Sequence, residues 1–242
     1  MTRTAIVTGG SRGIGAAISA GLKQAGYKVA ANYAGNDEAA AKFKEETGIP
    51  VYKWSVADYD ACVEGIKQVE ADLGSVDILV NNAGTCFMSD FPDIPATELK
   101  AQMAVNFESA FYCCQAAVPL MLERDGVRKI INISSNGAYN FNVFDPVHYR
   151  TSKAAMDTLT KDLARRYATR KISVNSLAPA MTETPLFGLL SEETIAKAIA
   201  EMPHGAAMQP AQVASWVGFL AGDGGDISSG NVIVLNQGRD VR

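Results

Sequence analysis

The sequence predicts an α/β fold, a Rossmann-type doubly wound sheet of about seven parallel strands flanked by helices on both faces. Short apolar runs alternate with longer helix-compatible segments along almost all of the 242 residues. No proline-rich or serine-rich linker and no internal repeat interrupts this alternation. With 48% hydrophobic and 20% charged residues, the chain can build a large core. We therefore expect one domain over residues 1–242.

The predicted strands are short, apolar and often β-branched, as buried parallel strands are. They span residues 4–8, 28–33, 51–56, 76–81, 129–134, 172–177 and 231–235. Apolar residues at three- and four-residue spacing predict covering helices. These span residues 14–25, 60–73, 107–122 and 152–168. The irregular stretches 85–95, 136–148 and 179–205 follow the carboxyl ends of strands, where ligands bind in an open parallel sheet.

Charge and composition exclude several functional classes. A formal net charge of -4 offers no broad cationic surface for a nucleic-acid backbone. No apolar run reaches the roughly 18 residues that span a bilayer, and the residues before the first strand are too few for a signal peptide. The cysteines lack C-x-x-C spacing and the two histidines stand far apart, so no metal site is predicted. We expect a cytoplasmic protein that binds neither nucleic acid nor membrane.

A glycine-rich turn, T-G-G-S-R-G-I-G over residues 8–15, follows the first predicted strand and opens a helix. Glycines let the backbone approach a pyrophosphate closely, and free amides at the start of a helix attract the anion. A tight strand-to-helix junction is the alternative, but a position at the first crossover favours a nucleotide. The predicted contacts are Gly9, Ser11, Arg12, Gly13, Ile14 and Gly15.

The end of the second predicted strand favours NADP(H) over NAD(H). An NAD-selective site commonly places a carboxylate here, which would repel a 2′-phosphate. Residues 31–34 instead read A-N-Y-A, and Asn32 and Tyr33 become predicted cofactor contacts. Arg12 is suited to pair with the phosphate and to stack on the adenine. Asp37 and Glu38 are alternative ribose ligands, although the start of a helix suits them better.

The strongest chemical signal is Tyr149 followed by Lys153, four residues apart on one helix face. A phenol ordinarily has a pKa of about 10, and a nearby ammonium favours its ionised form. Lys153 is therefore predicted to lower the pKa of Tyr149 and to make it a usable acid or base. Such pairs also arise by chance on amphipathic helices. Ser134 and Ser135, at the end of the fifth predicted strand, decide the matter by supplying a hydroxyl at the same sheet edge.

With T-G-x-x-x-G-x-G at residues 8–15, N-N-A-G at 81–84 and Y-R-T-S-K at 149–153, the sequence resembles the short-chain dehydrogenase/reductase family over essentially the full chain. The resemblance implies that Ser135 holds the substrate oxygen, that Tyr149 transfers the proton, and that Lys153 also grips the nicotinamide ribose. Ser135 is favoured over Ser134 because it lies fourteen residues before Tyr149, nearer the usual separation of about a dozen. Asn106 matches a fourth catalytic position, where an asparagine perturbs a helix and supports a water-linked proton path.

The resemblance also implies further cofactor contacts. Asn82, Ala83 and Gly84 should lie beside the adenosine half and steady the central sheet. Val56 should offer backbone contacts next to the adenine, where Ser55 replaces the acidic or amide residue that is frequent in the family.

The segment V-N-S-L-A-P-A at residues 174–180 resembles the family's segment after the sixth strand and places Pro179 near the cofactor. Thr184 matches a threonine that touches the nicotinamide carboxamide in relatives. Ala180 replaces a glycine, which would cost on the order of 1 kcal/mol if the position required a positive φ angle.

These residues together imply an NADPH-dependent carbonyl reductase that interconverts a ketone and a secondary alcohol. The first 84 residues look especially like bacterial acetoacetyl-CoA and 3-oxoacyl-thioester reductases. Stretches 85–93, 138–148 and 181–190 are rich in large apolar residues and suggest an apolar pocket. The substrate stays open between a 3-oxoacyl thioester and a small ketone. A thioester enzyme should present cations to the carrier's phosphates, and Arg124, Arg128 and Arg150 are the candidates.

An alternative is a non-catalytic sensor or scaffold that binds NADP(H), but such a protein needs no proton-transfer residues.

Relatives commonly form homodimers or homotetramers through helices that correspond to residues 107–122 and 152–168, so the same is expected here. His148 is assigned to the rim of the pocket, because adjacent helical residues point apart. The polar segment 236–242 is expected to fray or to meet a neighbouring subunit.

Overall fold

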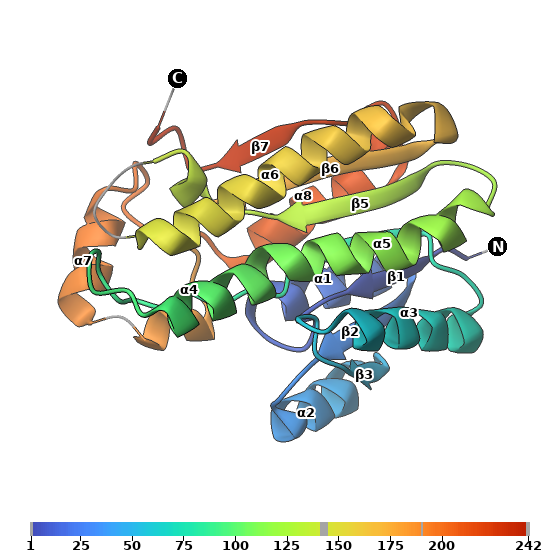
Figure 1. Ribbon diagram of the computed structural model, residues 1–242, viewed down its shortest axis with the longest axis horizontal. Helices are drawn as coiled ribbons and strands as arrows, with labels where there is room; N and C mark the ends of the chain where they lie inside the picture. The colour runs from blue at the N-terminus through green and yellow to red at the C-terminus, as the bar shows by residue number, and fades with distance from the viewer. Residues whose placement is uncertain (1, 141–144, 190, 241–242) are drawn as a thin grey trace.

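The protein is described by a computed structural model that covers residues 2–140, 145–189 and 191–240. Seven parallel strands form one sheet in the order β3-β2-β1-β4-β5-β6-β7 (Figure 1). The chain passes from β3, at one edge, back to the centre before it builds the other half, so the order reverses between β1 and β4. Ligands bind at such a switch point. The strands are β1 (Thr4–Val7), β2 (Lys28–Tyr33), β3 (Val51–Lys53), β4 (Ile78–Asn81), β5 (Arg128–Ile133), β6 (Ile172–Pro179) and β7 (Val232–Leu235).

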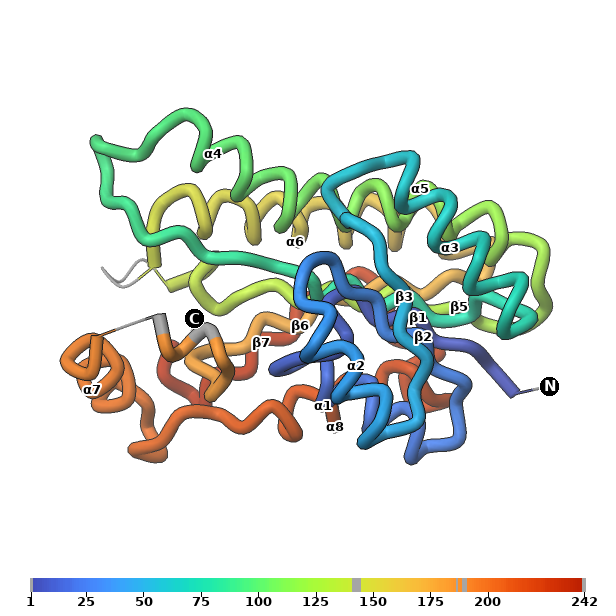
Figure 2. Tube along the Cα trace, turned by 90° about the horizontal axis from the view of Figure 1, so that it is seen from below, coloured from blue at the N-terminus to red at the C-terminus, as the bar shows by residue number. Residues whose placement is uncertain are grey.

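Helices cover both faces of the sheet, as the two views in Figures 1 and 2 show. On one face lie α1 (Gly13–Gln24), α2 (Asp37–Thr47) and α8 (Pro210–Ala221). On the other lie α3 (Tyr59–Leu73), α4 (Ala96–Met103), α5 (Ser109–Leu122) and α6 (Val147–Tyr167). The predicted doubly wound fold is confirmed.

Each face of the sheet has its own core. Val7 and Val80 pack with the helices α1 and α8, whereas their neighbours Ile6 and Leu79 pack with α3 and α5. In register, Ile6 of β1 stands beside Leu79 of β4. Because successive strand residues alternate between the two faces, burial of both faces explains the nearly continuous apolar runs in the sequence.

Two differences from the predicted boundaries shape the edge of the sheet where the strands end. α6 begins at Val147 rather than at residue 152, directly after Pro146, whose fixed φ suits the start of a helix. Tyr149 therefore lies in the first turn of this helix. The stretch predicted as irregular after β6 contains a 3-10 turn (Pro185–Leu189) and α7 (Glu192–Ala200). Ser191 caps α7 by accepting a hydrogen bond from the Thr194 amide over 3.2 Å.

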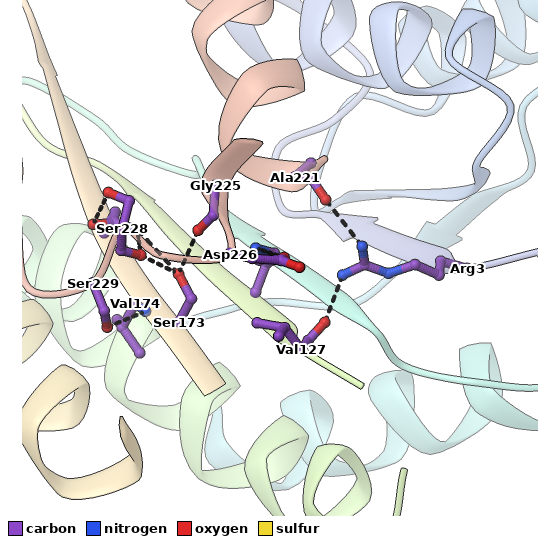
Figure 3. A network of polar contacts seen from close by, with 11 residues as sticks. Arg3, Val127, Ser173, Val174, Ala221, Gly225, Asp226, Ser228 and Ser229 are labelled. Carbon is purple, nitrogen blue, oxygen red and sulfur yellow. Dashed lines mark hydrogen bonds and ion pairs between the residues drawn. The ribbon is translucent and has the colours of Figure 1, made fainter. Parts of the chain in front are cut away.

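A polar network closes the opposite edge of the sheet, where the strands begin (Figure 3). Arg3 donates hydrogen bonds to the carbonyl oxygens of Ala221, over 3.1 Å, and Val127, over 2.8 Å. Ser173 at the start of β6 donates to the carbonyl oxygen of Ser228. The Arg3 bonds join the residue before β1 to the end of α8 and to the residue before β5, and the Ser173 bond joins β6 to the segment before β7.

Two of the arginines proposed as a cationic approach lie at this same edge. Arg128 is the first residue of β5 and pairs with Asp77 at 3.1 Å, with both side chains buried. Arg124 donates to the carbonyl oxygen of Gly74, the C-cap residue of α3, over 2.8 Å. The prediction that Arg124 and Arg128 meet a substrate's phosphates is wrong, because both serve the amino edge of the sheet.

Candidate active site

The start of α1 is arranged to receive an anion. Its N-cap, Arg12, makes no side-chain capping bond, and no acidic residue lies in the first turn. A helix start of this kind keeps backbone amides for an external acceptor. The turn also needs its glycines: Gly9 has a φ of 61°, and a Cβ on Gly15 would lie 2.1 Å from the Gly9 carbonyl oxygen. The turn therefore fits a pyrophosphate group.

The N-N-A-G turn after β4 is bonded to this glycine turn. The Thr8 hydroxyl oxygen accepts hydrogen bonds from the amides of Asn82, over 2.9 Å, and Ala83, over 3.0 Å. The Asn82 side chain donates to the Thr8 carbonyl oxygen over 2.9 Å, and the Asn81 side chain donates to Asn132 over 2.8 Å. The two turns are thus hydrogen-bonded to each other at the point where the strand order of the sheet reverses.

One long cleft along the carboxyl edge gathers nearly all the residues predicted to contact a cofactor. They are Gly9, Ser11, Arg12, Gly13, Ile14, Gly15, Asn32, Tyr33, Val56, Asn82, Ala83, Gly84, Tyr149, Lys153 and Thr184. Ser55 lines it as well, whereas Pro179 lines an adjoining pocket instead. The cleft and the pocket share Tyr149 and Thr184, so they meet at the tyrosine. An extended dinucleotide fits this cleft.

No aspartate or glutamate is among the described residues that line this cleft. Asn32 at the end of β2 accepts from the Gly9 amide over 3.3 Å and donates to the Trp54 carbonyl oxygen over 3.0 Å. Asp37 begins α2 and is engaged by the Tyr33 hydroxyl at 3.0 Å and by the Lys53 ammonium at 2.7 Å. Asp37 is therefore engaged at the start of α2, the position that the sequence analysis favoured over a contact with the ribose.

The structure separates the two candidate serines. Both serines line the pocket, but it is the side chain of Ser135 that shares a hydrogen bond with that of Tyr149. The hydroxyl of Ser134 instead donates to the carboxylate of Asp157 over 3.0 Å, toward α6. Ser135 is thus the serine placed to act together with Tyr149.

The pKa values of Tyr149 and Lys153 differ from the expectation. Burial raises the pKa of Tyr149, and the charge of Asp145 raises it further, whereas the bond with Ser135 lowers it. Lys153 is 4% exposed and donates to the Ile133 carbonyl oxygen over 2.9 Å, and burial lowers its own pKa to about 8. The pKa of Tyr149 is thus raised overall, because burial outweighs the lowering that Lys153 was expected to cause. Tyr149 keeps its proton at neutral pH.

Asn106 occupies a π-helical turn (Ala104–Glu108) between α4 and α5, a form that often marks functional sites. It is fully buried, and its side chain bonds to both polar backbone groups of Thr85. The Asn106 Oδ1 accepts a hydrogen bond from the Thr85 amide over 2.8 Å, and the Asn106 Nδ2 donates one to the Thr85 carbonyl oxygen over 2.9 Å. A Cβ on Gly84 would lie 3.4 Å from the Asn106 Oδ1 and 3.5 Å from the Lys153 Nζ. Both side chains therefore converge above this glycine.

The pocket beside Ser135 and Tyr149 is mainly apolar. The predicted pocket-forming stretches contribute Cys86, Met88, Met181 and Phe187, whereas residues 141–144 and 190 lie outside the described residues. Ala180 also lines the pocket. The described non-glycine residues with positive φ are Lys171 and Gln237, so Ala180 carries none of the strain considered for it.

Three charged residues near the site were not foreseen. Asp157 follows Lys153 by one helical turn, and this spacing could have revealed it. Asp145 lines the pocket from a stretch without periodicity, which offered no signal. Arg239 lines it from a segment expected to fray or to meet a neighbour. The described part of that segment contacts the site, since Asp240 accepts hydrogen bonds from Asn136, over 2.8 Å, and from Asn140.

His148 does not lie on the rim of the pocket, contrary to the prediction. It is 3% exposed, and its Nε2 stands 3.0 Å from the Glu98 carboxylate on α4. Because successive helical residues point in different directions, Tyr149 faces the pocket while His148 packs between α6 and α4.

Comparison with known proteins identifies the family. A family model described as short chain dehydrogenase matches residues 3–194. The chain belongs to the short-chain dehydrogenase family. It is 44% identical over 240 residues to an acetoacetyl-CoA reductase of Rhizobium meliloti, covering 99% of each chain. It is 37% identical over 247 residues to the 3-oxoacyl-[acyl-carrier-protein] reductase FabG of Staphylococcus aureus, covering 98% of each.

Solved structures agree with this membership. The Pseudomonas aeruginosa RhlG/NADP active-site complex superposes with a TM-score of 0.91 at 29% identity, covering 98% of this chain and 96% of that one. The predicted family is confirmed, and as a short-chain dehydrogenase the protein is an oxidoreductase of alcohol and carbonyl groups.

Two further observations concern the described residues only. No helix within them is both long and apolar enough to cross a bilayer. They also contain no group of three or more His, Cys, Asp or Glu side chains arranged to hold a metal ion.

Proposed function

We propose that this short-chain dehydrogenase uses NADPH to reduce a 3-oxoacyl thioester to the 3-hydroxyacyl thioester. The observation that carries the proposal is the contact between Ser135 and Tyr149 where the cofactor cleft meets the apolar pocket. A ketone oxygen placed between these hydroxyls has a donor on either side. The relatives at 44% and 37% identity are an acetoacetyl-CoA reductase and a 3-oxoacyl-[acyl-carrier-protein] reductase, and this likeness supports a thioester over a small ketone.

The chain's residues would divide the chemistry as follows. A bound nicotinamide supplies the hydride, which adds to the carbonyl carbon. Tyr149, which burial keeps protonated, donates its proton to the oxygen as negative charge develops there. Ser135 donates a hydrogen bond to the same oxygen and so stabilises that charge. Lys153 binds the nicotinamide ribose, and Asn106 holds the backbone of Thr85 and supports the path that returns a proton to Tyr149.

The preference for NADPH rests on charge. Arg12 is exposed within the cleft, and the described lining residues include no carboxylate that would repel a 2′-phosphate. The guanidinium can pair with two phosphate oxygens at once. The NADP complex of a structural relative, Pseudomonas aeruginosa RhlG, supports the same cofactor class.

We further propose that the protein is cytoplasmic, binds no nucleic acid, and assembles as a homodimer or homotetramer. Exposed aromatic side chains support an assembly: Phe111 on α5 is 39% exposed, and Trp216 and Phe219 on α8 are 42% and 54% exposed. α5 is one of the two helices expected in the interface, whereas α8 was not foreseen. Light scattering coupled to size-exclusion chromatography measures the assembly directly.

Loss of NADPH absorbance with a panel of substrates tests the proposed reaction. The panel contains acetoacetyl-CoA and unconjugated aliphatic and cyclic ketones. We expect kcat/KM for acetoacetyl-CoA to exceed that for any unconjugated ketone by at least about 100-fold, because the carrier contributes binding energy. Comparable or faster reduction of a simple ketone would contradict the thioester assignment.

A further inference from the structure

Asp145 places a carboxylate in the wall of the mainly apolar substrate pocket. It lies four residues before Tyr149, and its side chain faces the space bounded by Met88, Met181 and Phe187. Burial raises the pKa of Asp145, and the positive charges of Arg150 and Arg239 oppose that shift. Removing the Asp145 carboxylate from water in this way opposes folding, because a charge without a paired partner is costly to bury.

The carboxylate of Asp145 has no bonded partner within residues 2–140, 145–189 and 191–240. Its backbone carbonyl oxygen accepts a hydrogen bond from the Arg150 Nε over 2.8 Å, but neither carboxylate oxygen takes part in a hydrogen bond or ion pair there. Asp145 is only partly buried and lines the pocket, so its carboxylate is accessible to a ligand that enters there.

Asp145 also stands next to the reacting position. A Cβ on Gly137 would lie 2.5 Å from the Asp145 Oδ2 and 3.2 Å from the Ser135 Oγ. The carboxylate and the serine hydroxyl therefore flank the same small gap. A ketone whose oxygen is held by Ser135 brings its neighbouring carbons close to the charge of Asp145.

The cation that lines the pocket does not cancel this charge. Arg239 pairs with Asp240 at 3.1 Å and with Glu201 at 3.7 Å. Its positive charge is thus already balanced by two carboxylates. Of the two charged side chains that line the described pocket, Asp145 is therefore the one whose carboxylate has no bonded cation there.

We propose that Asp145 is a specificity-determining residue that excludes free 3-oxo acids and admits their neutral thioesters and esters. The inference rests on the proposed function, because it concerns the acyl group in the same pocket. A free 3-oxo acid carries its own carboxylate two bonds from the ketone carbon, whereas a thioester is uncharged there. Two like charges about 6 Å apart at an effective dielectric of about 20 correspond to a penalty on the order of 100-fold in affinity.

Competition against acetoacetyl-CoA reduction tests this charge filter. Inhibition constants are measured for acetoacetate, an anion, and for ethyl acetoacetate, its neutral ester, with the wild type and with Asp145→Asn, which keeps the shape and removes the charge. We expect the wild type to favour the ester by about 100-fold and the variant to favour it by less than about 10-fold, mainly through tighter acetoacetate binding. The ratio cancels any effect of Asp145 on Tyr149, since both ligands use the same tyrosine.

Two control variants separate charge at this position from other effects. Asp145→Glu restores the carboxylate and should restore the preference for the ester. Asp162→Asn removes a carboxylate from the exposed side of α6, where it pairs with Arg166 at 3.3 Å, and should leave the wild-type ratio unchanged. An ester-to-acid ratio in Asp145→Asn equal to that of the wild type would overturn the inference.

Failure of the thioester assignment can be distinguished from failure of the charge filter. If the wild type did not reduce acetoacetyl-CoA, the thioester assignment would fall. The affinities of the two ligands for the NADP⁺-loaded enzyme, measured by calorimetry without turnover, would then decide the charge filter. Equal affinities in the wild type would refute it.

Discussion

The side chain of Asn106 donates a hydrogen bond to the Ser152 hydroxyl over 3.0 Å, and Ser152 donates in turn to the carbonyl oxygen of Tyr149 over 2.6 Å. Asn106 belongs to the π-helical turn between α4 and α5, whereas Ser152 and Tyr149 belong to α6. This relay connects the turn to the backbone of the proposed proton donor. The position of Tyr149 is therefore coupled to a residue far away in the sequence.

Replacing Asn106 with Ala should reduce both activity and stability. The change removes the acceptor of the part-buried Thr85 amide, which costs about 1–3 kcal/mol, whereas the Thr85 carbonyl oxygen keeps its hydrogen bond from Gln102. We expect kcat to fall by at least about 10-fold. Denaturant unfolding and steady-state kinetics measure the two effects. Ser152→Ala, which breaks the relay but spares Thr85, should lower kcat with a smaller loss of stability. An Asn106→Ala enzyme with wild-type kcat would contradict the coupling.

The parts of the fold that follow from local pattern could be predicted. The parallel strands are buried on both faces, so β1 and β4 appear in the sequence as apolar runs. The glycine turn at Gly9 and Gly15 was recognisable because close backbone approach excludes other residues. The start of α6 was placed too late, since apolar periodicity is weak in its first turn, which holds the polar Tyr149.

The electrostatics of the site could not be predicted in the same way. Spacing alone puts Lys153 one turn from Tyr149, but it does not tell how deeply both are buried, and burial decides both pKa values. Asp145 precedes α6 in a stretch without periodicity, so its place in the pocket depends on tertiary packing. The two serines were distinguishable only by their partners, because Asp157 takes the hydroxyl of Ser134.

Replacing Arg12 with Ala should weaken the selection of NADPH. Loss of a charge-assisted contact with the 2′-phosphate should lower kcat/KM for NADPH by about 10- to 100-fold and leave that for NADH within about 3-fold. Kinetics with each cofactor at subsaturating concentration measure the ratio. Lys23→Ala removes a cation that is engaged elsewhere, by the Thr47 carbonyl oxygen, and should keep the wild-type ratio. A parallel loss with both cofactors would show that Arg12 does not read the phosphate.

Replacing Asp157 with Asn should shift the alkaline limb of the pH profile. Burial lowers the pKa of Lys153 to about 8, and the charge of Asp157 raises it. If the ammonium binds the cofactor, kcat/KM for NADPH declines as pH rises through about 8 in the wild type. Without the carboxylate the pKa of Lys153 drops further, so the decline should move to lower pH, by about half a unit to one unit.

Ser176→Ala is the matched control for that shift. It removes one hydroxyl donor, 2.7 Å from the Asp157 carboxylate, and keeps the charge. Its pH profile should therefore retain the inflection of the wild type more closely than that of Asp157→Asn. An alkaline inflection at the same pH in the wild type and in Asp157→Asn would show that Asp157 does not control the ionisation of Lys153.

The most direct test of the account is the turnover of Tyr149→Phe with acetoacetyl-CoA and NADPH, measured beside its affinity for NADPH. Phenylalanine keeps the ring and removes only the hydroxyl that donates the proton. We predict that kcat falls by about 10²- to 10⁴-fold while the dissociation constant for NADPH stays within about 3-fold. A variant that reduces the thioester at close to the wild-type rate would contradict the role of Tyr149 as proton donor.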